Sequence, residues 1–213
     1  MLFLISMLLY KPVFKRFYDL IFSGLAILVL SPLFLVLIIS GSIAMRGNPF
    51  FLQARPGKKE KLFWLIKFRS MSFAKDEDGK LLPNDKRLNK YGKFLRVTSL
   101  DELPELLNIF IGDMSFVGPR PLLPEYLPYY RENERVRHSV RPGLTGLAQA
   151  RGRNNIRNWE ERFAYDIEYV ENVNLLLDIK ILFETLFAVL RRKGIVSGEK
   201  AVVGRLDDER KER

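Results

Sequence analysis

Two adjacent carboxylates, Asp101 and Glu102, are the side chains of this sequence whose type and spacing best suit chemistry. They lie in the segment RVTSLDELP, which starts at Arg96 and in which a helix is expected to begin. A helix N-terminus offers free N–H groups and a positive dipole end, which suit a phosphate. An ionised aspartate there can attack phosphorus to give an aspartyl-phosphate. Alternatively, both carboxylates hold Mg²⁺, an ion that often bridges carboxylates and substrate phosphates.

The same segment also has a purely structural interpretation. Ser99 followed at the third position by Glu102 matches a capping box, in which the two side chains cap the first turn of a helix. Asp101 would then be an acidic residue at the helix N-terminus without a catalytic role. The pattern alone leaves both interpretations open, because a capping role does not exclude a catalytic one.

An irregular loop after this helix carries a single arginine. In GDMSFVGPRP, residues 112–121, Pro119 and Pro121 flank Arg120. The prolines would hold Arg120 at a fixed angle, and a guanidinium fork grips phosphate oxygens bidentately. The alternative is a structured turn without a ligand.

A second loop, residues 140–154, alternates glycine, arginine and asparagine. Its arginines include Arg141 and Arg153, which could cradle a phosphate or a nucleotide. A basic surface loop is the alternative, and this pattern does not decide between them.

One apolar run, Leu20 to Met45, is expected to position this chemistry at a membrane. It contains 26 residues without a charged side chain or histidine, enough to cross a bilayer core of about 30 Å. Ser31-Pro32 interrupts it, and both flanks are basic, which favours the cytoplasmic side for both ends. A re-entrant helix satisfies both ends, whereas charge alone also allows a spanning helix with a proline kink. With the carboxylates and arginines, this anchor fits magnesium-assisted phosphoryl chemistry at the bilayer surface.

The remaining pattern predicts a mostly helical α/β domain with a small β element. Strands are expected at 50–53 and 62–68, and helices at 88–96, 100–111, 158–171 and 175–192. We therefore divide the chain into a membrane-associated segment, 1–46, with a re-entrant helix at 20–45, a cytoplasmic catalytic domain with interfacial amphipathic helices, 47–198, and a charged, mobile tail, 199–213.

The composition argues against several kinds of site and favours some classes of binding partner over others. The 213 residues include no cysteine and one histidine, His138, which argues against thiolate or multi-histidine metal sites and a cysteine nucleophile. The net charge of +10 fits anionic lipid or a polyphosphate ligand. Nucleic acid ranks last, because the basic residues are scattered among apolar ones.

Several ordered motifs resemble those of the bacterial sugar transferase family, the monotopic phosphoglycosyl transferases, and most of all its small members. The resemblance covers roughly residues 11 to 198. It rests on KRFYD from Lys15, QARPG from Gln53, KFRSM from Lys67, LRVTSLDELPELLNIFIGDMSFVGPRPLLPEYL from Leu95, VRPGLTGLAQARGRN from Val140 and LDIKILFETL from Leu177.

The resemblance implies transfer of a phosphosugar from a UDP-sugar to undecaprenyl phosphate, with release of UMP. It implies that Asp101 is the nucleophile of a covalent phosphosugar intermediate, that Glu102 is its partner, and that Mg²⁺ is bound at Asp101. We expect substrate binding by five cationic side chains: Lys67, Arg96, Arg120, Arg141 and Arg153.

The resemblance also implies a re-entrant membrane helix, broken at Ser31-Pro32. It places the protein on the cytoplasmic face of the bacterial inner membrane, in contact with membrane lipid, and we leave open a homodimer. Departures from the family pattern at Arg69, Leu147 and Ala150-Arg151 leave the role of Arg69 and the identity of the sugar open.

Two rival functions remain open at this point. A membrane-surface adaptor would bind anionic lipid through its basic face and would not need Asp101. A nucleic-acid-binding membrane protein would need a concentrated basic stripe, which the sequence lacks.

Overall fold

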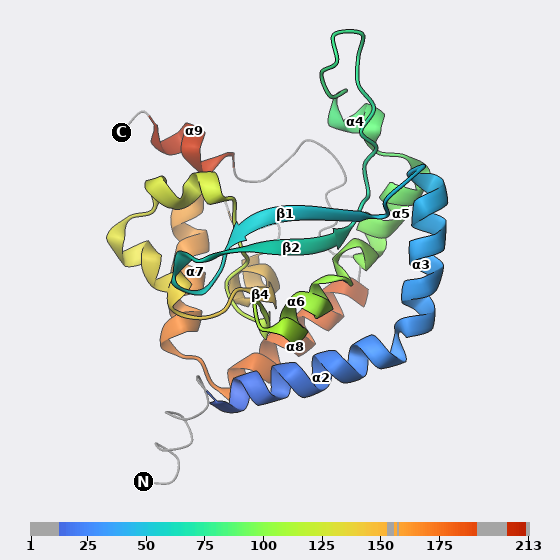
Figure 1. The fold of residues 1–213 in the computed structure, drawn as a ribbon. Helices are drawn as coiled ribbons and strands as arrows, with labels where there is room; N and C mark the ends of the chain where they lie inside the picture. The colour runs from blue at the N-terminus through green and yellow to red at the C-terminus, as the bar shows by residue number, and fades with distance from the viewer. Residues whose placement is uncertain (1–12, 153–155, 157, 191–203, 212–213) are drawn as a thin grey trace, which may run out of the picture.

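The structure, a computed structural model, describes residues 13–152, 156, 158–190 and 204–211 (Figure 1). The described part is mostly helical, as predicted, and it has two small sheets where one small β element was expected. Its α-helices are α2 (Lys15–Val29), α3 (Ser31–Ala44), α4 (Asn84–Arg87), α5 (Lys90–Thr98), α6 (Glu105–Ile111), α7 (Trp159–Glu171), α8 (Leu175–Leu190) and α9 (Leu206–Arg210). Its strands and shorter helices are β1 (Phe50–Pro56), β2 (Leu62–Phe68), β3 (Ser115–Val117), β4 (Gly143–Thr145), η2 (Lys58–Glu60), η3 (Leu100–Glu102), η4 (Pro124–Tyr129), η5 (Glu132–Ser139) and η6 (Ala148–Gly152).

The helices α2 and α3 form an elbow around one side of the molecule, bent by 64° at Leu30 (Figure 1). Pro32 lacks an N–H group, which frees the Leu28 carbonyl. The Ser31 hydroxyl donates to that carbonyl at 2.8 Å and so satisfies it. The predicted break at Ser31-Pro32 is therefore confirmed.

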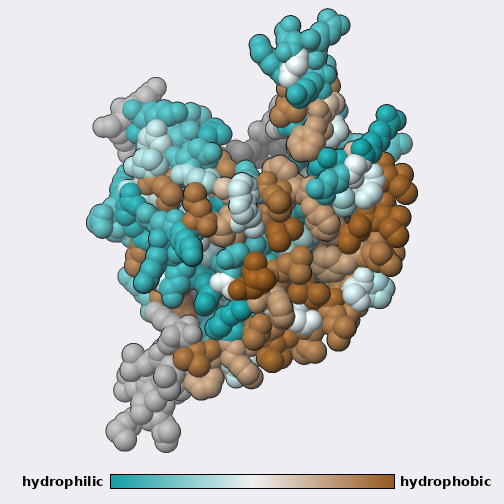
Figure 2. All heavy atoms as spheres, in the orientation of Figure 1, coloured by the Kyte–Doolittle hydropathy of each residue, from teal (hydrophilic) through white to brown (hydrophobic). Residues whose placement is uncertain are grey.

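No single helix in the described ranges is long and apolar enough to cross a membrane, although α2 and α3 qualify together as a bent pair. Large apolar side chains are exposed along both helices. Figure 2 shows this surface as a continuous hydrophobic region, whereas hydrophilic side chains gather on the other side of the view.

The first turns of α2 tie the elbow to the rest of the molecule. Lys15 forms a buried ion pair with Asp178 of α8, at 2.5 Å. The Arg16 guanidinium donates to the Ile109 and Phe110 carbonyls at the end of α6, at 2.6 and 2.7 Å. Asp19 accepts from the Ser115 hydroxyl and from the backbone N–H of Phe116 in β3, both at 3.1 Å. These contacts explain why the otherwise apolar helix α2 begins with the charged segment KRFYD.

The long hairpin β1–β2 crosses the molecule, in antiparallel register from Phe50↔Phe68 to Pro56↔Leu62 (Figure 1). Alternate residues of β2, among them Phe63 and Leu65, are buried against α6. The Asn108 side chain of α6 accepts from the Ile66 N–H and donates to the Trp64 carbonyl, so that helix and strand are joined through polar groups as well. The first predicted strand is confirmed and runs three residues further than expected.

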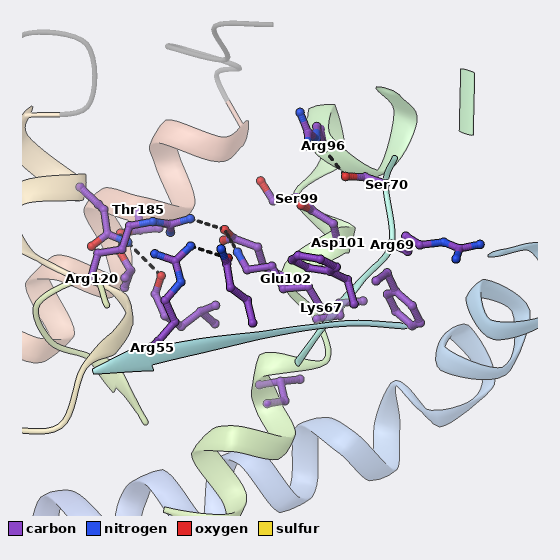
Figure 3. A pocket seen from close by; sticks show the side chains of 18 of the residues that line it. Arg55, Lys67, Arg69, Ser70, Arg96, Ser99, Asp101, Glu102, Arg120 and Thr185 are labelled. Carbon is purple, nitrogen blue, oxygen red and sulfur yellow. Dashed lines mark hydrogen bonds and ion pairs between the residues drawn. The ribbon is translucent and has the colours of Figure 1, made fainter. Parts of the chain in front are cut away.

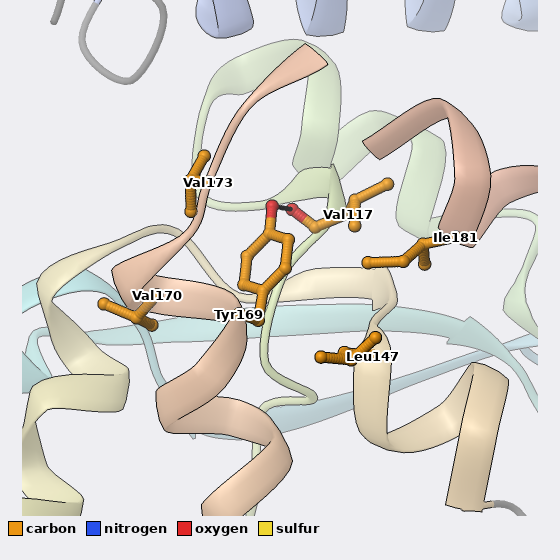
Figure 4. Close-up of a cluster of buried hydrophobic side chains, with 6 residues drawn as sticks. All are labelled: Val117, Leu147, Tyr169, Val170, Val173 and Ile181. Atoms are coloured by element: carbon orange, nitrogen blue, oxygen red, sulfur yellow. Dashed lines mark hydrogen bonds between the residues drawn. The ribbon is translucent and has the colours of Figure 1, made fainter. Parts of the chain in front are cut away.

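A second core joins the parallel pair β3–β4 to α7 and α8. Figure 4 shows its buried side chains, which are Val117, Leu147, Tyr169, Val170, Val173 and Ile181. The Tyr169 hydroxyl lies 3.0 Å from the Val117 carbonyl and 2.7 Å from Asp178. Strand β3, which leads into residues 118–121, is thus held both by the packing of Val117 in this core and by the hydrogen bond from Tyr169.

Two expectations from the sequence differ from the structure. The helix predicted at 100–111 is divided by Pro104 into η3 and α6. The prediction of a mobile tail at 199–213 is wrong for the part that forms α9, because Leu206 is fully buried against Tyr126 and Trp159. The hydrogen bonds of Arg210 to both carboxylate oxygens of Glu134, at 2.6 and 2.8 Å, add to this packing. The charged composition of this segment favoured an unpacked tail, although its apolar residue Leu206 packs into the core.

Candidate active site

Asp101 and Glu102 lie in η3, in a pocket of about 910 Å³ between β2, α5, α6 and α8 (Figure 3). Ser99 has a left-handed backbone, with φ 57°, and ends α5. Its side chain makes no capping hydrogen bond. The capping-box interpretation is therefore wrong: the turn around Ser99 starts η3, and the Glu102 carboxylate is directed elsewhere.

Glu102 is held by two cations from different elements. Its Oε1 accepts from Arg120 at 2.6 Å and from Lys67 of β2 at 3.0 Å. Lys67 also pairs with the buried Glu105 at 2.9 Å. Burial alone would raise the pKa of Glu102, but Arg120 and Lys67 outweigh it and lower the pKa to about 2. Glu102 is consequently ionised and fixed in position.

Asp101 differs from its neighbour in both contacts and charge. Its carboxylate forms no ion pair or side-chain hydrogen bond with another of the described residues. Burial, and then the negative charge of Glu102, raise the pKa of Asp101, while Lys67 and Arg96 oppose the shift. A pair of carboxylates whose environments push their pKa values apart is typical of sites that assign them different roles. Among the described residues, Asp101 is thus the carboxylate of the two that no ion pair holds in place.

The backbone of the Arg120 loop is fixed from two sides. The Arg137 guanidinium donates to the Arg120 carbonyl at 2.7 Å and pairs with the buried Asp166 at 2.9 Å. The Arg55 guanidinium donates to the Pro121 carbonyl at 3.2 Å. A Cβ at Gly118 would lie 2.4 Å from the Arg141 carbonyl, so only glycine fits at the start of the loop. Besides its two prolines, the loop is therefore held by two partly buried hydrogen bonds to its backbone.

The structure brings together three of the five predicted substrate-binding side chains. Lys67, Arg96 and Arg120 line the same pocket as the two carboxylates. Arg141 lies elsewhere, because its Nε donates to the Gly112 carbonyl at 2.8 Å and it lines a separate pocket of about 160 Å³. Arg153 is outside the described residues.

Several polar side chains that line the pocket were not predicted from the sequence. Arg55 lies beside Arg120 and Glu102, and its guanidinium also donates to Gln53 at 2.6 Å (Figure 3). Arg69 donates to the Met45 carbonyl and stacks over Phe73, directed away from the carboxylates. The quoted motif QARPG contained Arg55, and the alternation of side chains along β1 could have placed it on the pocket side, whereas the role of Arg69 was left open by the sequence. The other polar side chains missed are Ser70, Arg87, Thr145, Gln149 and Thr185.

The pocket has a cationic region and an apolar region. Six cationic side chains line it against the two carboxylates: Arg55, Lys67, Arg69, Arg87, Arg96 and Arg120. Apolar side chains from the elbow, β1, the turn after η3 and α8 line the rest, including Leu30, Phe51, Leu103, Leu182 and Leu186. This arrangement suits a molecule with several phosphate oxygens next to an apolar group.

The carboxylates suit a metal that is shared with a ligand. In the described ranges, no group of three or more carboxylate or histidine side chains could hold a metal ion. Mg²⁺ does not need such a cage, because it is usually bound by one or two carboxylates together with substrate phosphates and water. Asp101, which has no cationic partner at ion-pair distance in the part of the chain described, fits this role.

Comparison with known proteins gives a consistent result. A sequence profile described as bacterial sugar transferase matches residues 10–192. The uncharacterized sugar transferase EpsL of Bacillus subtilis is 45% identical over 183 residues, which cover 86% of this chain and 90% of EpsL.

Two longer relatives carry more specific names. The UDP-glucose:undecaprenyl-phosphate glucose-1-phosphate transferase of Klebsiella pneumoniae is 40% identical over 82% of this chain and 40% of its own length. The undecaprenyl-phosphate galactose phosphotransferase of Salmonella typhimurium is 38% identical over 84% of this chain and 41% of its own length. The chain thus spans less than half of these two proteins.

Proposed function

Because the chain belongs to the bacterial sugar transferase family, we propose that it moves a phosphosugar from a UDP-sugar to undecaprenyl phosphate and releases UMP. The chain is a transferase, and the two longer relatives are named for this pair of substrates. The observation that carries the proposal is Asp101, which has no ion-pair partner among the described side chains and lies beside a fixed Glu102 in a pocket lined by cations.

In the first half-reaction, a carboxylate oxygen of Asp101 attacks the phosphorus that bears the sugar. The bond from that phosphorus to the oxygen bridging the two phosphates breaks, and UMP leaves with this oxygen. The product is an aspartyl-phosphosugar. Arg120 and Arg55 lie where they can bind the diphosphate oxygens, and such fixed charges carry much of the rate in phosphoryl transfer.

In the second half-reaction, a phosphate oxygen of the polyprenyl phosphate attacks the same phosphorus. The bond between phosphorus and Asp101 breaks, and the carboxylate is regenerated. The product is a polyprenyl diphosphate sugar. Holding the lipid phosphate next to Asp101 reduces the entropic cost of bringing the two reactants together.

The proposal is tested by supplying membranes that contain the protein with a panel of UDP-sugars and undecaprenyl phosphate. We expect UMP release and a lipid of the mass of a polyprenyl diphosphate sugar. Anionic-lipid binding without any such product would favour the adaptor function instead.

We also propose that Mg²⁺ is bound by Asp101 together with the diphosphate oxygens. When bound, the ion would neutralise charge that develops on the leaving phosphate. We expect EDTA to abolish UMP release and added Mg²⁺ to restore it. Full activity after exhaustive chelation would contradict a metal role.

The opposite pKa shifts of the two carboxylates predict the acid limb of the pH profile. The nucleophile must be ionised, so the rate should fall as the pH drops through the pKa of Asp101, which lies above the ordinary value of 3.8. Glu102, with a pKa of about 2, stays ionised over this range. Lys67 lowers the pKa of Asp101, and Lys67→Met should therefore shift the limb to higher pH. An unshifted limb in that variant would show that another group controls it.

We propose that the elbow of α2 and α3 enters the inner membrane and returns to the cytoplasmic face. In this cysteine-free chain, a single Phe3→Cys substitution should resist a membrane-impermeant thiol reagent added outside intact cells. Replacing Pro32 with alanine should favour a continuous helix, expose the cysteine to the reagent and reduce activity. Labelling of Phe3→Cys with Pro32 intact would indicate a spanning helix.

A further inference from the structure

An apolar groove of about 540 Å³ lies between α2 and α8. Its walls are formed by Tyr18 and Phe22 of α2 and by one face of α8, which contributes Leu175, Ile179, Leu182, Phe183 and Leu186. The charged side chains at its rim are Lys15, Asp19 and Asp178. Lys15 and Asp178 pair with each other, and Oδ1 of Asp19 accepts two hydrogen bonds from β3, so each of these charged side chains has at least one partner within the protein.

The groove is continuous with the pocket that holds Asp101. Three side chains, Phe116, Leu182 and Leu186, line both. The α8 wall runs from Leu175 to Leu186, which is about 16 Å at the helical rise per residue. A ligand can therefore lie along the groove and still place one end beside the carboxylates.

We propose that this groove binds the isoprenoid chain of the acceptor lipid, with its phosphate at Asp101; this inference rests on the proposed function. A nucleotide sugar is too polar for a groove whose described walls are almost entirely apolar. The chain of a polyprenyl phosphate is apolar along its whole length, and its phosphate must reach the cations of the pocket. The side chains common to both cavities are where the two parts of such a molecule meet.

Two phenylalanines of α8 allow a matched test. Phe183 lines the groove, and its side chain is 56% exposed. Phe187, about one turn further along α8, is 54% exposed and lines neither cavity. Phe183→Gln and Phe187→Gln remove the same apolar group from the same helix, so any general loss of membrane affinity should be similar in both.

The two half-reactions separate the acceptor from the donor. In Phe183→Gln, we expect the UMP burst without acceptor to be unchanged and the KM for undecaprenyl phosphate to rise about tenfold, equivalent to about 1.4 kcal/mol. For an acceptor with a single isoprene unit, which cannot extend along the groove, the KM should change little. Phe187→Gln should resemble the unsubstituted protein with both acceptors.

Equal KM changes in the two variants would overturn the proposal and indicate a face that contacts membrane lipid generally. A normal KM in Phe183→Gln would overturn it as well. A missing UMP burst in the unsubstituted protein would contradict the proposed function instead. The groove is then tested directly with a photoreactive polyprenyl phosphate, which should crosslink to the α8 peptide that contains Ile179 and Phe183. Crosslinking only outside the groove would reject the assignment.

Discussion

Asp101→Asn should reduce UMP release at saturating Mg²⁺ by at least about a thousandfold, a loss of about 4 kcal/mol in transition-state stabilisation. The amide has nearly the shape of the carboxylate but cannot attack phosphorus effectively. Because no ion pair to a described side chain depends on Asp101, and its pKa is raised by burial, the neutral amide should not destabilise the fold. The melting temperature should therefore stay constant while activity disappears.

A suitable control is Asp78→Asn, the same substitution in the exposed loop that precedes α4. It should leave both the rate of UMP release and the melting temperature unchanged. Asp101→Asn activity of about a tenth of the wild-type rate would correspond to a loss of only about 1.4 kcal/mol, and covalent catalysis through Asp101 would then be untenable. Full activity in Asp101→Asn would show that another group is the nucleophile, whereas lipid binding without UMP release in the unsubstituted protein would favour the adaptor function.

Local patterns in the sequence predicted most of the elements. The strand expected at 62–68 and the Ser31-Pro32 break each have a physical cause within a few residues, and both are confirmed. The capping box failed because Lys67 and Arg120, which are distant in sequence, compete for the Glu102 carboxylate. Tertiary contacts decided what the local pattern left open.

The site was predicted only in part for the same reason. Asp101, Glu102 and Arg120 were recognisable because motifs place them near turns. The loop that carries Arg141 gave no indication of its direction, and the structure turns this side chain to the Gly112 carbonyl. The ion pair between Arg137 and Asp166 joins two segments 29 residues apart, and neither segment shows its partner in its own pattern.

Arg137→Met should lower the free energy of unfolding by about 3–5 kcal/mol, the cost of leaving a buried charge without its partner. The guanidinium and the Asp166 carboxylate are almost fully buried. Arg137 also donates to the Tyr130 hydroxyl at 3.2 Å and to the Arg120 carbonyl. Its loss should therefore loosen the Arg120 loop as well. Denaturant unfolding in detergent and the KM for the UDP-sugar measure the two effects.

The matched control is Arg135→Met, because Arg135 pairs with Glu60 at 2.6 Å but both side chains are about one-third exposed. This pair should contribute at most about 1 kcal/mol. Adding Asp166→Asn to Arg137→Met removes the stranded charge, so the double variant should recover part of the stability. Equal losses in Arg135→Met and Arg137→Met would show that burial does not set the strength of the pair. No recovery in the double variant would place the effect in the hydrogen bond to Arg120 and in packing against Tyr130.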